Sequence, residues 1–416
     1  MRDECVWEVT AKERPLTSHS LEVNWSADAC VIGGGITGLS TALHLAQKGF
    51  SVIVLEAGEV ADGGSGKNVG LVNPGLWIPP EDITRTLGES EGERANSILG
   101  AATETVFGLI QKFAIACDAT TTGTLHCAHN QTGVRELERR HQQFTRRGYP
   151  VELVTGTECR NITGMAGVPA ALLDHRAGTV NPLAYTRGLA RAATSLGVTI
   201  AQHSAVEQLE RVGDQWLVST GAATVRAGSV VLATNAYTES GWNVVKKHFF
   251  PGHFYQVASK PLSEELTQSV LPGNQGSWDT RSVLSSIRKD CEGRLILGSL
   301  GRGETKPKHF VRSWANRIQR HYFPQLNGIE WDMSWTGKIG FTPDHMIRVF
   351  SPAKDLYAVT GYNGRGITTG SVMGKGLAEL IVQGTDEYLP VPVKPVDPIT
   401  GISLRAIAYE AGFTLY

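Results

Sequence analysis

The sequence of 416 residues predicts an α/β protein that joins a Rossmann-like domain, discontinuous along the chain, to an α+β domain built on an antiparallel sheet. Three observations predict this fold. Residues 28–57 have the pattern of a strand, a glycine-rich turn, a helix and a second strand. Residues 249–341 show short alternating strands with many aromatic side chains, and residues 356–382 repeat the order of strand, glycine-rich turn and helix.

The N-terminal element has the pattern of a dinucleotide-binding unit. Apolar residues 29–32 predict a buried strand and residues 39–46 predict a helix. Between them lie the three glycines of a G-x-G-x-x-G turn, Gly33, Gly35 and Gly38. The first permits the tight turn, the second lets a pyrophosphate approach the backbone and the third lets helix and strand pack closely. The helix N-terminus offers free N–H groups to that pyrophosphate. Glu56, which follows a strand over residues 51–55, would accept a hydrogen bond from a ribose 2′-hydroxyl.

Composition and charge exclude several classes of protein. Because 39 Lys and Arg stand against 40 Asp and Glu, there is no electrostatic argument for nucleic-acid binding. The 6 cysteines contain no C-x-x-C pair and no metal-ligand cluster, which indicates no metal site and a reducing, cytoplasmic compartment. The sequence has no run of about eighteen apolar residues, so no membrane span is expected. Peripheral association with the inner face of the membrane stays open.

Further patterns predict the elements between these landmarks. Residues 87–116 and 133–147 carry helical patterns, and Asn181 begins a helix that Gly197 ends. Residues 215–227 predict a hairpin, and a separate buried strand follows over residues 229–232.

The same patterns divide the chain into two domains and two terminal extensions. Because the C-terminal strand and helix mirror the N-terminal unit, we expect the last third of the chain to close the first domain. The extension at the N-terminus is expected to lie over that domain. The ranges are 28–80, 150–240 and 342–390 for the first domain, 81–149 and 241–341 for the second, and 1–27 and 391–416 for the extensions.

Four motifs occur in order along the chain: residues 31–56, 63–68, 233–238 and 361–366. Together they resemble the FAD-dependent amine and amino-acid oxidoreductases of the D-amino-acid oxidase superfamily, over about residues 28–385. The resemblance implies FAD as the cofactor and a small amine or imino acid as the substrate. Three segments show a more specific resemblance, to bacterial L-pipecolate oxidase: residues 70–80, 276–281 and 409–413.

The resemblance also implies which residues hold FAD. The ADP half would lie on the first glycine turn and Glu56, the ribityl chain and flavin beside residues 65–68, and the adenine at the backbone of Val206. The turn at 364–366 would set a helix N-terminus against the flavin N1 edge, where the helix dipole stabilises negative charge; an ordinary strand-to-helix connection is the alternative. The expected set is Gly33, Gly35, Ile36, Thr37, Gly38, Glu56, Ala57, Ser65, Gly66, Lys67, Asn68, Val206, Thr234, Asn235, Gly364, Arg365, Gly366, Ile367 and Thr368.

Two departures from the family pattern bear on the substrate. Lys67 stands where the family often has Arg, and Ile339 stands where many amino-acid oxidases place the Arg that binds the substrate carboxylate. If the substrate is an amino acid, another donor must therefore hold its carboxylate. We expect Arg365, on the flavin turn, to do so, and Lys338 and Arg288 are the next candidates. A structural role on its strand is the alternative for Arg288.

Aromatic residues of the second domain are candidate walls of the substrate pocket. They are Tyr255, Trp278 and Trp335, with His253 beside them. An apolar cage favours the neutral amine, whose lone pair assists hydride loss to flavin N5. This chemistry needs no compulsory protein base, so no catalytic base is assigned; His253 is the one candidate, with a structural histidine as the alternative.

The resemblance implies oxidation of a small cyclic secondary amino acid, L-pipecolate to piperideine-6-carboxylate in lysine breakdown, by hydride transfer to flavin N5. Three alternatives stay open. The substrate would instead be another amine such as γ-glutamylputrescine, or an N-methyl amino acid, or the chain would be an FAD-binding subunit that needs a partner. Oxygen or a respiratory-chain quinone would accept the electrons.

Overall fold

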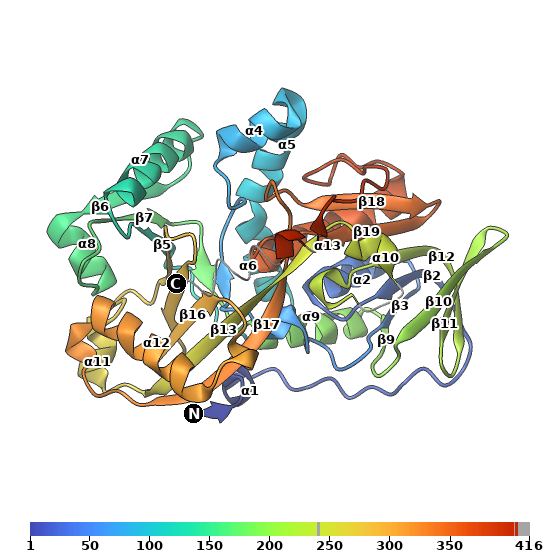
Figure 1. The fold of residues 1–416 in the computed structure, drawn as a ribbon. Helices are drawn as coiled ribbons and strands as arrows, with labels where there is room; N and C mark the ends of the chain where they lie inside the picture. The colour runs from blue at the N-terminus through green and yellow to red at the C-terminus, as the bar shows by residue number, and fades with distance from the viewer. Residues whose placement is uncertain (239–241, 403, 407–416) are drawn as a thin grey trace.

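The computed structural model describes residues 1–238, 242–402 and 404–406, which form two large sheets with helices around them (Figure 1). Within these residues one sheet has eight strands and the other nine, and β4 (Leu71–Val72) pairs with β8 (Gly178–Thr179). The predicted fold class is confirmed. The first sheet holds the Rossmann-like unit, and the second is mostly antiparallel.

The eight-stranded sheet is built around β2 (Trp25–Ile32), α2 (Ile36–Gln47) and β3 (Val52–Leu55). β2 and β3 are parallel, with Cys30 opposite Ile53, and both strands end in continuous buried apolar runs, as parallel strands covered on both faces do. The order is β10-β11-β12-β2-β3-β9, and β19 joins β12 to β18. The remaining strands are β9 (Thr199–Ala201), β10 (Val206–Val212), β11 (Gln215–Thr220), β12 (Thr224–Leu232), β18 (Arg348–Ala353) and β19 (Leu356–Thr360).

Helices α9 (Pro182–Ser195) and α13 (Gly366–Gln383) pack on α2, and α6 (Ala102–Lys112) packs on α13. The approach of α13 to α2 is close, because a Cβ on Gly374 would lie 2.6 Å from the backbone nitrogen of Thr41. Small residues therefore set the distance between these two helices.

The nine-stranded sheet has the order β1-β17-β13-β16-β15-β14-β5-β7-β6. Helix α12 (Lys308–Tyr322) covers one face through Trp314 and Ile318, which share a core with Val257 and Leu297. The strands are β1 (Arg2–Asp3), β5 (Thr124–Cys127), β6 (Val151–Thr155), β7 (Ala170–Asp174), β13 (Phe250–Pro261), β14 (Gly276–Asp279), β15 (Ser285–Lys289), β16 (Arg294–Leu300) and β17 (Trp331–Phe341).

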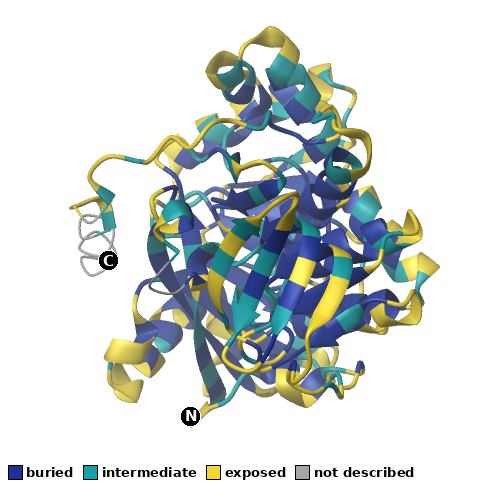
Figure 2. Ribbon diagram, turned by 90° about the vertical axis from the view of Figure 1, so that its right-hand side faces the viewer, coloured by how far each residue is buried: buried dark blue, intermediate teal, exposed yellow. Residues whose placement is uncertain are grey.

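The other helices lie mostly at the periphery, and Figure 2 shows buried residues gathered in the sheets and exposed residues on the outer helices. Three 3₁₀ turns lie at residues 235–237, 303–305 and 324–326. The α-helices are α1 (Val6–Thr10), α3 (Gly64–Lys67), α4 (Pro80–Leu87), α5 (Glu89–Gly100), α7 (Gln131–Arg146), α8 (Gly156–Thr163), α10 (Asn243–Lys246) and α11 (Glu264–Ser269).

The structure differs from the expected domain boundaries in two ranges. Residues 151–174, expected in the first domain, form β6, α8 and β7, and these strands pair with each other and with β5 in the nine-stranded sheet. Residues 89–112, expected in the second domain, form α5 and α6, which contact α13, and their Leu99 and Val106 lie in one buried cluster with Val31 of the eight-stranded sheet. Both placements depend on contacts between distant parts of the chain, which local sequence patterns do not encode.

The N-terminal extension and the region after the hairpin also differ from expectation. β1 pairs with β17, so the chain starts on the nine-stranded sheet, and residues 25–27, expected in the extension, begin β2. The strands expected at 223–227 and 229–232 are one strand, β12, because it pairs with β2 on both sides of Gly228. The segment 409–413 lies outside the described residues.

Helix α9 begins as the sequence predicts, at a cap that also ties down the N-terminal segment. The Asn181 side chain accepts a hydrogen bond from the Ala184 amide (3.0 Å) and donates one to the Thr10 hydroxyl (3.1 Å), and Asn181 is buried. We expect Asn181→Ala to lower the free energy of unfolding by about 2 kcal/mol, since the cap is lost and the buried Thr10 hydroxyl loses one of its two hydrogen-bond partners. Urea unfolding measures this loss.

Ser263→Ala is the matched control. Ser263 caps the exposed helix α11 through a longer contact to the Leu266 amide (3.4 Å), and its loss should cost under about 1 kcal/mol. Equal losses in the two variants would contradict the cap's dual role.

Candidate functional site

A cavity of about 500 Å³ lies where the two sheets meet. The carboxyl ends of β2 and β3 reach it at Ile32 and Leu55, and the chain after β12 reaches it at Ala233. Residues of β13, β14, β16 and β17 line the opposite wall. Ligands of open α/β sheets bind in this position, outside the carboxyl ends of the strands.

The glycine turn between β2 and α2 forms one end of the cavity, which we call the glycine end. Gly33 has φ +112°, and a Cβ there would lie 3.0 Å from the Ala233 carbonyl oxygen. A Cβ on Gly38 would lie 2.0 Å from the Gly33 carbonyl oxygen, so only glycine allows the helix to start this close to the strand. Gly35 is the N-cap of α2 and supplies no capping side chain. The first amides of α2 thus face a cavity that suits a phosphate.

Glu56 is held at the same end by backbone donors. Its Oε2 accepts a hydrogen bond from the Gly34 amide (2.6 Å) and its Oε1 from the Gly58 amide (2.9 Å). A carboxylate fixed in this way beside the turn is a ready acceptor for ribose hydroxyls. The glycine end therefore fits the ADP half of a dinucleotide.

The second glycine turn, between β19 and α13, meets the first across the cavity. Gly364 has φ +82°, and the Asn363 side chain braces the turn by accepting from the Thr342 amide (2.8 Å) and donating to the Gly361 carbonyl (2.6 Å). Helix α13 begins at Gly366, and its N-cap, Arg365, makes no side-chain capping bond. The positive end of a long buried helix therefore faces the cavity, where it would stabilise negative charge.

Most residues expected to bind the cofactor line this cavity. They are Gly33, Gly35, Ile36, Thr37, Glu56, Ala57, Ser65, Asn68, Val206, Thr234, Asn235, Gly364, Arg365, Gly366 and Ile367.

Four residues of the expected cofactor set lie behind the lining. Gly38 and Gly66 allow close packing, since a Cβ on Gly66 would lie 2.4 Å from the Ala61 carbonyl oxygen. Lys67 contributes its backbone carbonyl, which accepts hydrogen bonds from the side chains of Gln256 and Trp335 (both 2.9 Å). The Thr368 hydroxyl donates to the Asn73 carbonyl (2.8 Å). The structure gives these four residues supporting contacts.

Another part of the lining, which we call the aromatic end, contains Trp77, Tyr255, Trp278 and Arg365, while Lys338, also in the lining, lies over the Tyr237 ring. The Arg365 guanidinium lies 5.1 Å from the Trp278 ring centre and 5.5 Å from that of Trp77. Within the described residues the Arg365 side chain makes one hydrogen bond, a long contact of 3.5 Å from Nη1 to the Pro74 carbonyl. Arg365 is therefore a buried cation whose guanidinium has further N–H donors for a ligand.

Burial sets the charge state at the aromatic end. It raises the pKa of Tyr255 to about 12, so the phenol stays neutral. It lowers the pKa of Arg365 to about 9, helped by the nearby charge of Arg140, and the guanidinium is still a cation at neutral pH.

Three of the expected substrate residues lie outside the cavity lining. The Arg288 guanidinium donates to the carbonyls of Val180 (2.7 Å), Gly70 and Val69 (both 3.2 Å), so its donors hold the loop before β4 in place. The Trp335 indole donates to Lys67, as described above. His253 pairs with Lys338 between β13 and β17, and its Nε2 lies 3.8 Å from a Glu304 carboxylate oxygen.

Several lining residues were not expected from the sequence. Gln256 has an Oε1 that is buried without a hydrogen-bond partner in the described structure, and the same is true of Nε1 of the expected Trp278. These two polar atoms are enclosed in the wall of the cavity. Gln256 could have been found from the sequence, because a glutamine inside an apolar strand is unusual. Nothing in the sequence indicated that Trp77 and Tyr362 line the cavity, because a loop tryptophan and a turn tyrosine are common in cores. Ile339 also lines the cavity.

Two kinds of feature are absent from the described residues. No group of three or more His, Cys, Asp or Glu side chains in this part of the chain could hold a metal ion. None of the helices in the described ranges is long and apolar enough to cross a membrane.

Comparisons with known proteins agree with this geometry. The family model described as FAD dependent oxidoreductase (DAO) matches residues 28–380. The chain is 30% identical over 395 residues to the γ-glutamylputrescine oxidoreductase of Escherichia coli K12, covering 94% of this chain and 92% of that protein. It is 29% identical over 401 residues to the probable oxidoreductase OrdL of Haemophilus influenzae, covering 94% and 91%.

The crystal structure of glycine oxidase from Geobacillus kaustophilus shares the fold, with a TM-score of 0.72 at 18% identity over 86% of this chain and 95% of that one. The fold, the cavity between two glycine turns and the match of the family model agree. This chain belongs to the DAO family of FAD-dependent oxidoreductases, and its cofactor is FAD.

Proposed function

We propose that this protein oxidises an aliphatic amine that carries a carboxylate at its far end, with γ-glutamylputrescine as the type substrate. The observation that carries the proposal is Arg365, a buried cation with few protein partners in a cavity walled by aromatic rings. The similarity to γ-glutamylputrescine oxidoreductase along nearly the whole chain supports the same class.

The distribution of charge favours an anionic tail. Among the described lining residues, the charged side chains are Glu56, Asp62, Lys338 and Arg365. Glu56 and Asp62 belong to the glycine end and Lys338 is solvent-exposed beside Tyr237, whereas the aromatic end has the buried cation Arg365. A free diamine would place its second ammonium beside a buried guanidinium, which costs energy, whereas a carboxylate there would be stabilised.

The aromatic end also suits the reacting amine. Burial among Trp77, Tyr255 and Trp278 lowers the pKa of an ammonium group, so the substrate binds as the neutral amine whose lone pair assists loss of hydride. Bound FAD supplies the two-electron acceptor for that hydride, and the imine product hydrolyses in water to an aldehyde and ammonia. The described lining contains no histidine, which agrees with a reaction that needs no protein base.

The cofactor would lie along the cavity with its ADP half on the first glycine turn. Glu56 would accept from the ribose and the Val206 backbone would meet the adenine. The flavin would lie between residues 64–68 and the N-terminus of α13, whose unpaired amides would stabilise the reduced, anionic ring.

L-pipecolate, or an N-methyl amino acid, is the second candidate. Arg365 favours it, because a guanidinium on the flavin turn would hold a carboxylate near the reacting carbon. Ile339 argues against it, because the position that often carries the carboxylate-binding Arg in amino-acid oxidases is apolar here. The full-length similarity places more weight on γ-glutamylputrescine.

Anaerobic reduction of the flavin tests the substrate. We expect γ-glutamylputrescine to bleach the purified yellow protein within seconds, and L-pipecolate, D-pipecolate, L-proline and sarcosine to do so far more slowly. Fast bleaching by L-pipecolate alone would reject the proposed substrate and keep the reaction class. No bleaching by any of these amines, with FAD bound, would indicate a subunit that acts only with a partner chain.

Arg365→Met tests the carboxylate contact. We expect the half-saturating concentration of γ-glutamylputrescine to rise roughly ten-fold or more, the scale of a lost charge-assisted hydrogen bond. N-acetylputrescine, which has the same amine and no carboxylate, should change little. Lys338→Met is the control, since Lys338 is solvent-exposed and screening weakens its charge. Equal effects on both amines would show that Arg365 only shapes the pocket.

Glu56→Gln tests the assignment of the ADP half. The amide keeps the shape of the side chain and loses the charge that accepts from the ribose and from two backbone amides, so we expect FAD to bind roughly ten-fold more weakly. Titration of the apoprotein with FAD, followed by flavin fluorescence, measures this. Glu59→Gln, at an exposed position outside the cavity, should leave FAD affinity unchanged.

A further inference from the structure

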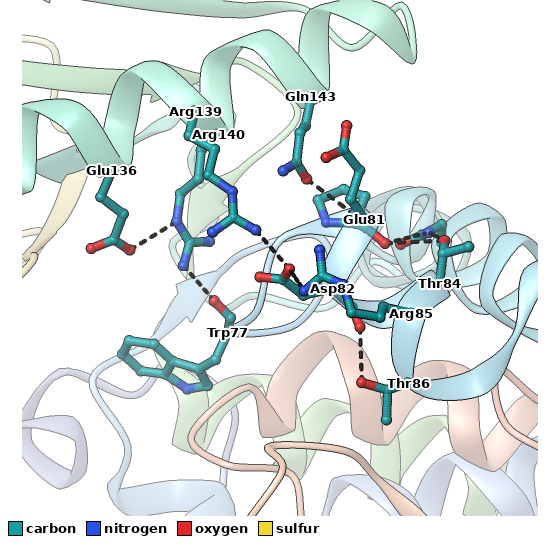
Figure 3. Close-up of polar contacts among 12 residues, drawn as sticks. Trp77, Glu81, Asp82, Thr84, Arg85, Thr86, Glu136, Arg139, Arg140 and Gln143 are labelled. Atoms are coloured by element: carbon teal, nitrogen blue, oxygen red, sulfur yellow. Dashed lines mark hydrogen bonds and ion pairs between the residues drawn. The ribbon is translucent and has the colours of Figure 1, made fainter.

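Helix α7 reaches the wall of the aromatic end through one buried side chain, Arg140. Its Nη2 donates to the Trp77 carbonyl at 2.6 Å and its Nε to Glu136 at 3.1 Å, as Figure 3 shows. The Arg140 side chain is 10% exposed, unlike that of the neighbouring Arg139, which is 50% exposed and pairs with Asp82 at the surface. A buried charge-assisted bond is stronger than an exposed ion pair, so Arg140 is the stronger of the two anchors.

The residue that Arg140 holds is part of the cavity wall. Trp77 lies in the loop between β4 and α4, outside any helix or strand. Its indole lines the cavity and donates to the Asn363 carbonyl, on the turn that carries Arg365. Trp77 is therefore fixed at its carbonyl by α7 and at its ring by the flavin turn, and its ring lies against the Arg365 guanidinium.

Arg140 also adds charge behind this wall. A second cavity of about 30 Å³ is lined by Arg140, Arg365, Trp278 and Asp174 among others. Asp174, which Arg176 engages through two contacts of 2.9 and 2.5 Å, offsets part of the charge on Arg365, and Glu136 offsets part of the charge on Arg140. Burial lowers the pKa of Arg365, and repulsion from the Arg140 guanidinium lowers it further. An anion at the aromatic end would relieve this repulsion.

We propose that Arg140 is a positioning residue that sets selectivity for anionic ligands. It holds Trp77 against the flavin turn, so that Arg365 keeps its orientation, and it adds a second positive charge behind that guanidinium. The proposal rests on the proposed function in one respect, that the substrate tail is a carboxylate. Arg140 itself touches neither the 500 Å³ cavity nor the reacting atoms.

The experiment compares Arg140→Met with Arg139→Met in the FAD-bound protein. Binding of benzoate and of benzamide, which differ only in charge and the atoms that carry it, is followed through the flavin absorption spectrum. We expect Arg140→Met to raise the Kd of benzoate about ten-fold and that of benzamide no more than about two-fold, as for a lost charge-assisted contact. Arg139→Met should leave both close to the wild-type values, because its ion pair is solvent-exposed.

Arg140→Lys separates charge from anchoring. Lysine keeps the charge but cannot bond Glu136 and Trp77 together in the planar geometry of a guanidinium, so it should restore part of the benzoate affinity. FAD content and urea midpoint check that each variant is folded.

Three results would overturn the proposal: equal weakening of benzamide, equal weakening by Arg139→Met, or a wild-type protein that does not prefer benzoate to benzamide. Failure of the proposed function shows separately, as a wild-type flavin that binds benzoate but is not reduced by γ-glutamylputrescine.

Discussion

The packing of α13 on α2 is the constraint on which the site depends. The two helices belong to opposite ends of the chain, and their N-termini face one cavity because glycines let the backbones approach. A Cβ on Gly370 would lie 2.9 Å from the Thr37 hydroxyl. In this contact Ser40 donates to the Ser371 carbonyl at 2.8 Å, and Thr37 bonds the Tyr362 hydroxyl at 2.7 Å. Two helix dipoles thus converge where an anionic cofactor would lie.

The middle motif of the chain completes this arrangement through one side chain. Asn235 follows β12, and its Oδ1 accepts from the Thr360 hydroxyl (2.7 Å) and the Gly361 amide (3.3 Å) at the start of the last turn. Its backbone has φ +40°, a conformation that asparagine tolerates better than most residues. One residue therefore links two motifs that are more than a hundred positions apart, and its side chain supports the second glycine turn.

Buried arginines show how position decides role in this protein. Arg288 and Arg365 are both buried, and the sequence made each a candidate for the substrate carboxylate. The Arg288 guanidinium donates to four backbone carbonyls, whereas Arg365 has one long contact to Pro74 and two aromatic neighbours. A cation whose donors are satisfied is structural, and one that faces a cavity with donors unpaired is poised to bind an anion. The number of satisfied donors separates the two roles.

The sequence by itself determined the local elements and the cofactor. Periodicity and glycine spacing predicted β2, α2 and β3, the cap at Asn181 and the second turn before α13, because each depends on residues a few positions apart. Tertiary structure alone decided that residues 151–174 join the nine-stranded sheet and that the Arg288 guanidinium donates its hydrogen bonds to backbone carbonyls. It also decided that Trp77 and Gln256 line the cavity. These facts depend on strand pairing and on which groups satisfy each other across distant parts of the chain, and local pattern carries no information about such partners.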